Sequence, residues 1–300
     1  MEPNAPVTRF LPEASLPEYN QREPLSIPGL ADYHCHCDYS IDATGSIDEY
    51  CIAALRRGLV EICFTTHFDS NPNSLGDADQ IRINSELQPS IPENLAPYVE
   101  DVRQADDTYH SKGLSVKLGL EFGWYKGCEE GVARLREMYT FDYMLCGIHE
   151  VGNACFACRE CFEACFSSLS VEEVVDKYTR QVVTAAESGV FDTIAHLDYI
   201  KKYGTEFFGP KLEELFAKAA KEQIFPALVK SGTALEVNTS GIRHGIDNYY
   251  PSIRIVNEAR RAGVEIRHLG SDAHVPWQIG LDFDAAASLV SSSMPAWDED

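Results

Sequence analysis

Short apolar runs alternate with longer amphipathic segments along most of this chain. The apolar runs have the length and residue types of buried strands and predict strands over residues 30–36, 60–66, 114–121, 143–148, 191–195, 233–238 and 264–270. The segments between them place apolar residues at helical spacing. They predict helices over residues 93–111, 129–138, 171–188, 211–230 and 252–262, a further helix after residue 46 and helical structure beyond residue 276. The polar stretch 71–92 predicts a long loop.

Two helix starts carry a reciprocal capping pattern. Ser46 is followed three residues later by Glu49, and Ser170 by Glu173, which is the pattern of a capping box. Pro226 lies inside the predicted helix 211–230 and is expected to disturb it, because proline removes a backbone hydrogen bond.

Alternating strands and helices predict a parallel sheet with right-handed crossovers. Seven such units close more readily into an α/β barrel than into an open sheet, and barrel chemistry lies at the carboxyl ends of the strands. We therefore expect one barrel domain over residues 30–300, preceded by a Pro-rich arm over 1–29 and interrupted by a Cys-rich insertion at 151–170.

The net charge of the chain excludes some classes of binding partner. The chain has 47 acidic and 25 basic side chains, for a formal net charge of −22. Such a surface repels nucleic-acid polymers and anionic membranes, so we expect neither as a partner. No apolar run approaches the roughly 20 residues of a membrane span, and the amino terminus lacks a signal pattern. We expect a cytoplasmic protein with reduced thiols; the composition does not determine an oligomeric state.

Histidines and acidic residues stand at the ends of the predicted strands. His34 and His36 are two residues apart on one strand, so both side chains point the same way and could hold one cation. The other strand-end candidates are His67, Glu121, His149, His196, Asp272 and His274. Imidazoles combined with carboxylates suit zinc, manganese or iron. Glu121 has two oxygens with which to bridge two cations. The pattern predicts a polynuclear metal centre. His110 and His268 lack this context.

Several of these motifs resemble the PHP (polymerase and histidinol phosphatase) superfamily, and within it the histidinol-phosphate phosphatases. The resemblance runs from Asp32 to His274. The matching stretches are Asp32–His36, Thr65–His67, Gly119–Glu121, Phe141–His149, Phe191–Asp198, Glu236–Gly241 and Gly270–His274. The last three stretches favour the phosphatase branch.

The resemblance implies a distorted (β/α)7 barrel that holds three divalent metal ions. The first ion would be held by His34, His36, Glu121 and Asp272, the second by Glu121, His149 and His196, and the third by His67, His274 and Asp42. Asp42 stands where some members have a histidine. The implied reaction is phosphomonoester hydrolysis by a metal-bridging hydroxide held by Glu121 and Asp272, with L-histidinol phosphate as the first candidate substrate.

Basic residues near the strand ends are candidates for binding this small phosphorylated substrate. Arg243 could grip phosphate with its fork of donors, Lys201 and Lys202 could add positive charge, and His244 could line the pocket. Two alternatives remain open. Another PHP hydrolase could act on a nucleotide or phosphodiester with the same metals, or the barrel could be a non-catalytic, metal- or redox-responsive binding protein.

Four cysteines form a run that the resemblance does not explain. Cys155, Cys158, Cys161 and Cys165 have the C-x2-C-x2-C-x3-C spacing of a bacterial ferredoxin run, although Phe166 follows instead of proline. One interpretation is a helix that places them on a packed face, because free cysteine behaves as a small apolar side chain. The others are an iron–sulfur or zinc site, and disulfides or redox sensing. Because the run follows His149, we expect it near the mouth of the active site.

Overall fold

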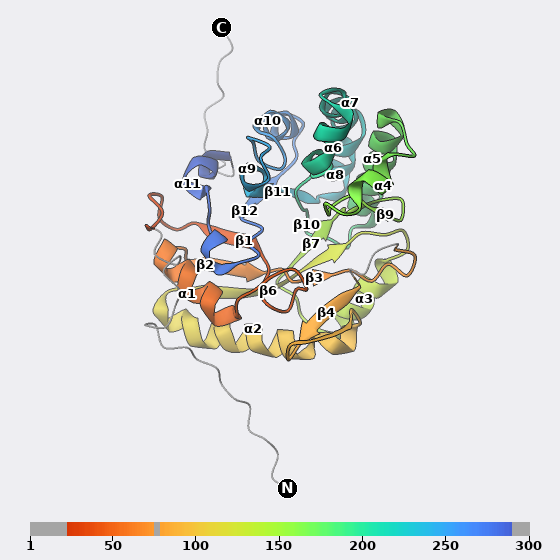
Figure 1. Cartoon of the computed structure of the whole chain (residues 1–300). Helices are drawn as coiled ribbons and strands as arrows, with labels where there is room; N and C mark the ends of the chain where they lie inside the picture. Colours follow the sequence, from red (N-terminus) through yellow and green to blue (C-terminus); the bar gives the residue numbers. More distant parts are fainter. Residues whose placement is uncertain (1–22, 75–78, 290–300) are drawn as a thin grey trace.

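The computed structural model describes residues 23–74 and 79–289 and shows a parallel barrel (Figure 1). Its main strands lie in the order β1-β2-β6-β7-β10-β11-β12, every adjacent pair is parallel, and the short β3 continues beside β6. Their bounds are β1 Ala31–Cys35, β2 Glu61–Phe64, β3 His67–Phe68, β6 Ser115–Gly123, β7 Tyr143–Gly147, β10 Thr193–Ile194, β11 Ala234–Asn238 and β12 Ile266–Gly270. The seven predicted strands and the α/β barrel are confirmed.

The first and last strands meet and nearly close the barrel. The amide of His36 donates to the carbonyl of Ala273 at 2.8 Å, and the amide of Asp272 donates to the carbonyl of His34 at 2.7 Å. These bonds lie beyond the end of β12, where the chain carries Asp272 and His274. Barrel closure therefore brings residues nearly 240 positions apart in the sequence to one edge.

Amphipathic helices surround the strands (Figure 1) and bury their apolar faces against them. The helices that lie in the predicted helical segments up to residue 262 are α1 Ile47–Arg57, α2 Ala96–Tyr109, α3 Glu129–Met138, α5 Val171–Ser188, α7 Lys211–Ala219, α8 Phe225–Ser231 and α10 Ile253–Arg261. Both predicted capping boxes are present, at Ser46 with Glu49 and at Ser170 with Glu173. The predicted helix 211–230 is interrupted by a π-helical stretch, Ala220–Ile224, directly before Pro226.

Some elements differ from the sequence-based expectation. The predicted loop 71–92 contains an antiparallel hairpin, β4 Gln80–Ile83 with β5 Glu86–Pro89, whose turn residues Asn84 and Ser85 have positive φ. A second hairpin, β8 Glu150–Val151 with β9 Ala154–Cys155, follows β7. The short helices α4 Phe162–Phe166, α6 Lys201–Phe208, α9 Ser240–Arg243 and α11 Phe283–Ala286 were not predicted individually, because they are too short to show a helical period.

The first described residues are hydrogen-bonded to the end of α1 and to α11. Most of the predicted arm, residues 1–22, lies outside the described part of the chain. Within residues 23–29, the amide of Leu25 donates to the carbonyl of Arg57, and the amide of Ser26 donates to Asp284 Oδ1. This segment therefore packs across α1 and the carboxyl-terminal helices. The division into arm, barrel and insertion stays a prediction. No helix among the described residues has the length and apolar character needed to cross a bilayer.

His268 lies in β12 and is not one of the predicted metal ligands. Its protonation is expected to make the folded protein less stable in acid. Its ring stacks on Tyr33 with 3.6 Å between centroids, and burial together with Arg267 lowers its pKa to about 4. The folded protein therefore resists protonation that the unfolded chain accepts, so stability falls as pH drops from about 6.5 to 4. Between pH 7 and pH 4.5 the free energy of unfolding should fall in both proteins. We expect this fall to be about 1–2 kcal/mol smaller in His268→Gln than in the native chain. Urea unfolding at both pH values measures this; parallel pH profiles for the two proteins would contradict it.

Candidate metal centre

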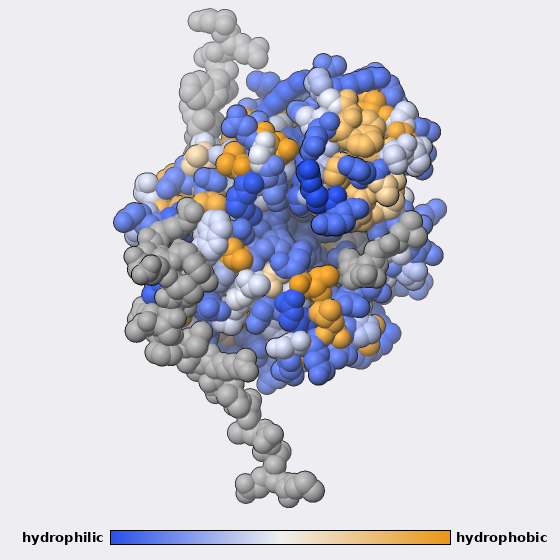
Figure 2. All heavy atoms as spheres, in the orientation of Figure 1, coloured by the Kyte–Doolittle hydropathy of each residue, from blue (hydrophilic) through white to orange (hydrophobic). Residues whose placement is uncertain are grey.

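The predicted ligands gather at the carboxyl ends of the strands. Each comes from β1, β3, β6 or the turn that follows a strand, so the barrel sets their positions. The set is His34 in β1 and His36 just after it, His67 in β3, Glu121 in β6, His149 after β7, His196 after β10, and Asp272 and His274 after β12. In the face shown in Figure 2, hydrophilic side chains line the hollow at its middle. One convergent site therefore contains ligands from six separate stretches of chain.

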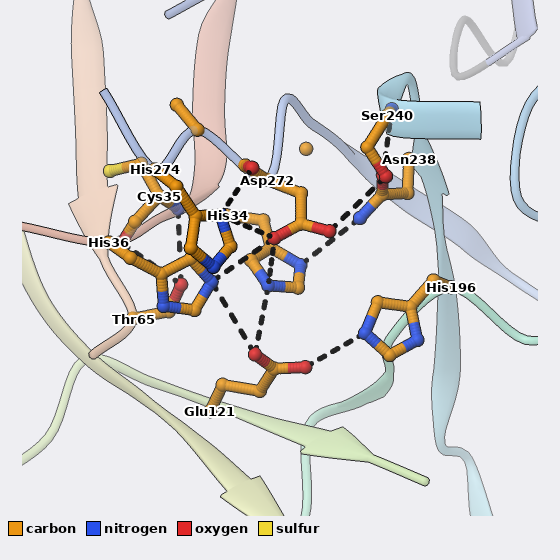
Figure 3. Close-up of polar contacts among 12 residues, drawn as sticks. His34, Cys35, His36, Thr65, Glu121, His196, Asn238, Ser240, Asp272 and His274 are labelled. Carbon is orange, nitrogen blue, oxygen red and sulfur yellow. Dashed lines mark hydrogen bonds and ion pairs between the residues drawn. The ribbon is translucent and has the colours of Figure 1, made fainter. Parts of the chain in front are cut away.

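Glu121 is the centre of this site. Its Oε2 atom lies 3.2 Å from Nε2 of His34 and 3.0 Å from Nδ1 of His67. Its Oε1 atom lies 2.9 Å from Nε2 of His196 and 3.3 Å from Nε2 of His149. Figure 3 shows the carboxylate with His34 and His36 on one side and His196 on the other. Because the two oxygens face different imidazoles, Glu121 can serve two cations at once.

Two aspartates complete the ring. Asp272 Oδ1 lies 3.2 Å from Nε2 of His36 and 3.6 Å from both Nε2 of His34 and Nδ1 of His274. Asp42 Oδ2 lies 3.3 Å from Nε2 of His274 and 3.6 Å from Nε2 of His67. The aspartate at position 42 thus reaches the two histidines with which the family resemblance groups it.

Some nitrogen atoms of the site have no hydrogen-bond partner within the protein and are suited to binding a metal ion. Nε2 of His36 and Nδ1 of His67 are buried and make no hydrogen bond, although carboxylate oxygens lie within ion-pair distance. Unpaired buried nitrogens are costly unless another partner supplies the missing interaction. Ligand atoms within 4.8 Å of one another form the groups His36–His67–His274, His34–His36–Asp272, His34–Glu121–His196 and His67–Asp69–His149. Imidazole and carboxylate groups in these sets suit zinc, manganese or iron.

The histidines and carboxylates of this site shift one another's pKa values. Burial would raise the pKa of Glu121, but His34, His67 and His149 outweigh it and hold that pKa well below its ordinary value. Burial would lower the pKa of His67, but Asp42 and Glu121 raise it to about 9. The carboxylates thus favour positive charge on His67, whereas burial and the neighbouring His67 and His274 hold the pKa of His36 well below its ordinary value. Because imidazole binds metal only when the ligating nitrogen is unprotonated, cations would replace these protons on binding.

Two glycines allow the ligands to approach the backbone. A Cβ atom on Gly147 would lie 2.6 Å from Glu121 Oε1 and from the ring of His149. A Cβ atom on Gly270 would lie 2.5 Å from Glu236 Oε2 and 2.6 Å from Cβ of His34. Side chains at either position would displace a ligand or the residue that supports it.

Two of the predicted ligands have unusual backbone conformations. His196 and Asp272 have positive φ values of 28° and 53°. Such conformations cost roughly 1–3 kcal/mol in residues other than glycine and cluster at functional sites. Hydrogen bonds hold both residues in place, from the His196 amide to Glu236 Oε1 at 2.7 Å and from the Asp272 amide to the His34 carbonyl at 2.7 Å. The fold therefore stores strain at the turns that aim these side chains.

Three supporting residues were not singled out as site residues from the sequence. Glu236 in β11 is 1% exposed and lies 3.0 Å from Nδ1 of His34, while Asn238 donates to Glu236 at 2.9 Å. Asp69 lies 3.8 Å from Nδ1 of His149. Glu236 is the one acidic residue in an otherwise uncharged, fully buried strand, and this was the available signal. Asp69 follows His67 by two residues and so shares its direction.

Substituting Glu236 should weaken metal binding without removing a ligand. We expect Glu236→Gln to lower metal affinity or turnover by roughly 10–100-fold, because carboxylates that orient metal-binding histidines commonly contribute that much. Chelator competition measures the affinity. Glu265→Gln, an exposed acid just before β12, is the matched control and should leave affinity unchanged. Native affinity in Glu236→Gln would mean that the contact with His34 does not orient the ring.

The predicted substrate residues lie beside the ring with different partners. Arg243 donates through Nη2 to the carbonyls of Ser271 and Asp272, at 2.8 and 2.9 Å, while its buried Nη1 has no partner. Lys202 Nζ lies 2.7 Å from the hydroxyl of Tyr199. Burial lowers the pKa of Lys202, whereas the negative charges of Asp272 and Asp42 act to raise it, so the ammonium lies close enough to interact with these two carboxylates. Arg243 and Lys202 are thus the cations with capacity left for an anion.

Lys201 and His244 differ from this pattern. Lys201 is 3% exposed and its ammonium lies 2.7 Å from Asp198, so its charge is matched within the fold. The Nδ1 atom of His244 lies 3.3 Å from the hydroxyl of Tyr250. Burial and the neighbouring Lys202 lower the pKa of His244 to about 3, which makes its ring neutral near pH 7. His244 therefore contributes an uncharged aromatic edge.

The cysteine run is not one helix, so that interpretation is wrong. Cys155 ends β9, whereas only Phe162–Phe166 is helical and contains Cys165. Cys158 and Cys161 are joined as a disulfide, so the expectation of reduced thiols is wrong for this pair, while the other eight cysteines are free. Cys155 Sγ lies 4.0 Å from Cys158 Sγ. The turn between β9 and α4 therefore gathers three of the four sulfurs.

Comparison with known proteins identifies relatives of this barrel. Residues 32–240 match the PHP domain family. A protein of Deinococcus radiodurans named "Probable histidinol-phosphatase" is 31% identical over 262 residues, which cover 87% of this chain and 93% of the relative. The histidinol-phosphatase of Lactococcus lactis subsp. lactis is 23% identical, over 87% of this chain and 90% of its own length.

A solved structure shows the same architecture. The crystal structure of histidinol phosphate phosphatase from Lactococcus lactis subsp. lactis, complexed with zinc, L-histidinol and phosphate, superimposes with a TM-score of 0.68. The match covers 88% of this chain and 93% of that chain at 20% sequence identity. At this identity the likeness establishes the shared fold.

Proposed function

Because this chain belongs to the PHP domain family and to its histidinol-phosphatase branch, we propose that it hydrolyses L-histidinol phosphate to L-histidinol and phosphate. The observation that carries the proposal is the ring around Glu121, which four imidazoles contact within 3.3 Å. Arg243 and Lys202 flank it. A ring of metal ligands beside free cationic donors is suited to binding a phosphoryl group.

We propose three divalent cations of zinc, manganese or iron as the cofactors. The zinc-containing structure of the Lactococcus enzyme supports zinc, and the ligand groups in this chain support several adjacent sites. Bound cations of this kind lower the pKa of water, supply a nucleophile near neutral pH and polarise a phosphoryl oxygen. Glu121 and Asp272 would be among the residues that hold these cations close to the phosphoryl group.

The remaining steps fall to residues of this chain. The Nη1 atom of Arg243 is free to donate to a phosphate oxygen while Nη2 stays bound to the loop that carries Asp272. Lys202 would neutralise a second oxygen. Developing charge on the equatorial oxygens would then be met by fixed donors, which lowers the barrier to phosphoryl transfer.

An aromatic wall supports the choice of an imidazole-bearing leaving group. Tyr199 stacks on His196 with ring centroids 4.2 Å apart, and it packs edge-on against Tyr250 at 5.2 Å and His244 at 6.1 Å. This wall adjoins Lys202 and the ring. Tyr199 and Tyr250 are buried and back this wall, so a flat heterocycle attached to the phosphate would pack against the partly exposed ring of His244. The net charge of −22 also favours a substrate that carries an ammonium group.

Other functions fit these observations less well. A nucleotide or phosphodiester hydrolase would use the same ring but needs room and donors for a base or second ester. A non-catalytic binding protein would have little need for buried carboxylates and strained ligand turns, which cost stability unless they serve chemistry. We propose the cytoplasm as the compartment, and eight unpaired cysteines support it.

A phosphate-release screen tests the proposal. Metal-loaded protein is assayed against L-histidinol phosphate, mononucleotides, a phosphodiester and sugar phosphates. We expect the highest kcat/KM with L-histidinol phosphate. A higher value for a nucleotide or diester would favour the other PHP hydrolase, and no turnover of any substrate by fully metallated protein would favour the binding protein.

A further inference from the structure

A cluster of sulfurs lies beside the ligand ring but belongs to a different segment. Cys155, Cys158 and Cys161 each offer a sulfur within 4.8 Å of the others, and each is only partly buried. They lie between β9 and α4, in the segment that follows the ligand His149. The described PHP ligands include no cysteine, so the reaction leaves this cluster without a role.

We propose that Cys155, Cys158 and Cys161 form a mononuclear thiolate site for zinc or another soft divalent cation, separate from the histidine–carboxylate centre. Thiolates select such metals over the hard cations. Partial exposure of all three residues gives a cation access to the sulfurs. The site goes beyond the phosphatase activity and does not depend on it.

The spacing of the sulfurs favours one metal ion over an iron–sulfur cluster. Tetrahedral zinc with bonds of about 2.3 Å places neighbouring sulfurs about 3.8 Å apart. Cys155 Sγ and Cys158 Sγ lie 4.0 Å apart, close to that value, whereas Cys158 and Cys161 are joined as a disulfide and can take up this spacing only after the bond is reduced. In a four-iron cluster each cysteine binds a different iron, which spreads the sulfurs wider. Although the cysteine spacing in the sequence is that of a ferredoxin run, the sulfurs in the folded protein lie too close together for a four-iron cluster.

The fourth cysteine of the run is engaged elsewhere. Cys165 Sγ donates to the carbonyl of Ala154 at 3.3 Å, and the residue is 3% exposed. Burial raises the pKa of its thiol to about 11, which disfavours the thiolate. Three sulfurs would thus bind the metal and leave the fourth position for water or an added ligand.

The turn that carries the cysteines is linked to the ligand His149. Cys155 pairs with Glu150 in the β8–β9 hairpin, and the amide of Phe156 donates to the carbonyl of His149 at 3.1 Å. On its other side, Cys155 lies close enough to Lys202 for a negative charge on its sulfur to interact with the ammonium. A cation bound to Cys155 would therefore brace the turn next to one ligand and one candidate substrate residue.

The bond between Cys158 and Cys161 must be reduced before metal can bind. A phosphine reductant cleaves it to two thiols and is itself oxidised to the phosphine oxide, with water supplying the oxygen and two protons. Metal binding then displaces the thiol protons to solvent. The site would therefore be metallated in the reduced protein and lost on disulfide formation.

Cobalt substitution tests the site directly. Full-length protein is reduced with a phosphine, loaded with Co²⁺ and examined for thiolate-to-cobalt charge-transfer absorption in the near ultraviolet. We expect this band in the native protein and in Glu121→Gln, because the histidine ring contains no thiolate. It should disappear in Cys155→Ser and in Cys158→Ser. The control Cys165→Ser should retain it.

Metal analysis gives a second readout. Reduced, zinc-loaded native protein should contain one more ion per chain than Cys158→Ser. Absence of the band from the reduced native protein, or equal zinc in both proteins, would overturn the proposal. Cysteine-dependent iron with acid-labile sulfide would also overturn it, in favour of a cluster. Phosphatase activity of Cys158→Ser shows separately whether the variant is folded and whether the proposed function holds.

Discussion

Glu121→Gln is expected to remove most of the bound metal and to lower turnover by roughly 10³-fold or more. The carboxylate lies within 3.3 Å of four imidazoles, whereas Asp272 reaches His34, His36 and His274 at 3.2–3.6 Å. An amide offers one neutral oxygen where two charged ones stood. Metal ions contribute several kcal/mol of transition-state stabilisation, and about 4 kcal/mol corresponds to a factor of 10³. Elemental analysis and phosphate release measure both effects.

The control for this variant is Glu222→Gln, which makes the same chemical change at an exposed glutamate. It should keep native metal content and kcat. Circular dichroism before and after chelation shows whether Glu121→Gln is still folded. A folded Glu121→Gln protein with full metal content and native turnover would rule out the bridging role.

Arg243→Ala is expected to lower kcat/KM for L-histidinol phosphate by about 10²-fold. The guanidinium has one buried nitrogen without a hydrogen-bond partner, and a charge-assisted hydrogen bond lost from a buried site costs about 2–3 kcal/mol. Arg243→Lys should recover only part of this, because an ammonium cannot reach the phosphate and the backbone carbonyls together. Steady-state kinetics on both variants measure the loss.

Metal content separates two explanations for the Arg243 variants. Nη2 of Arg243 also binds the carbonyl of Asp272, so the residue could act by holding that ligand in place. If metal content is native while kcat/KM falls, the side chain acts on substrate. Loss of metal in Arg243→Ala would instead assign it to supporting the Asp272 turn. Lys201→Met, which removes an ammonium already paired with Asp198, is expected to affect folding more than KM.

The fold and the residues of the candidate metal centre could be predicted largely from local patterns. Buried parallel strands appear as continuous apolar runs, and a histidine or acid at the end of such a run stands out because burying it without a partner is costly. This is why His34, His36 and Glu121 were found from the sequence. The same reasoning could have included Glu236, which is also an acid in a buried apolar strand. Its carboxylate contacts Nδ1 of His34.

The sequence by itself determined the alternation of strands and helices, the capped helix starts and the residue types available for a metal centre. These depend on periodicity and on residue chemistry, which are local properties of the chain. Only the tertiary structure decided that Glu121 faces four imidazoles, that Lys201 is paired while Arg243 is free to donate, and that three cysteines meet while the fourth turns away. Those outcomes depend on barrel closure and loop geometry, which join residues that are distant in the sequence.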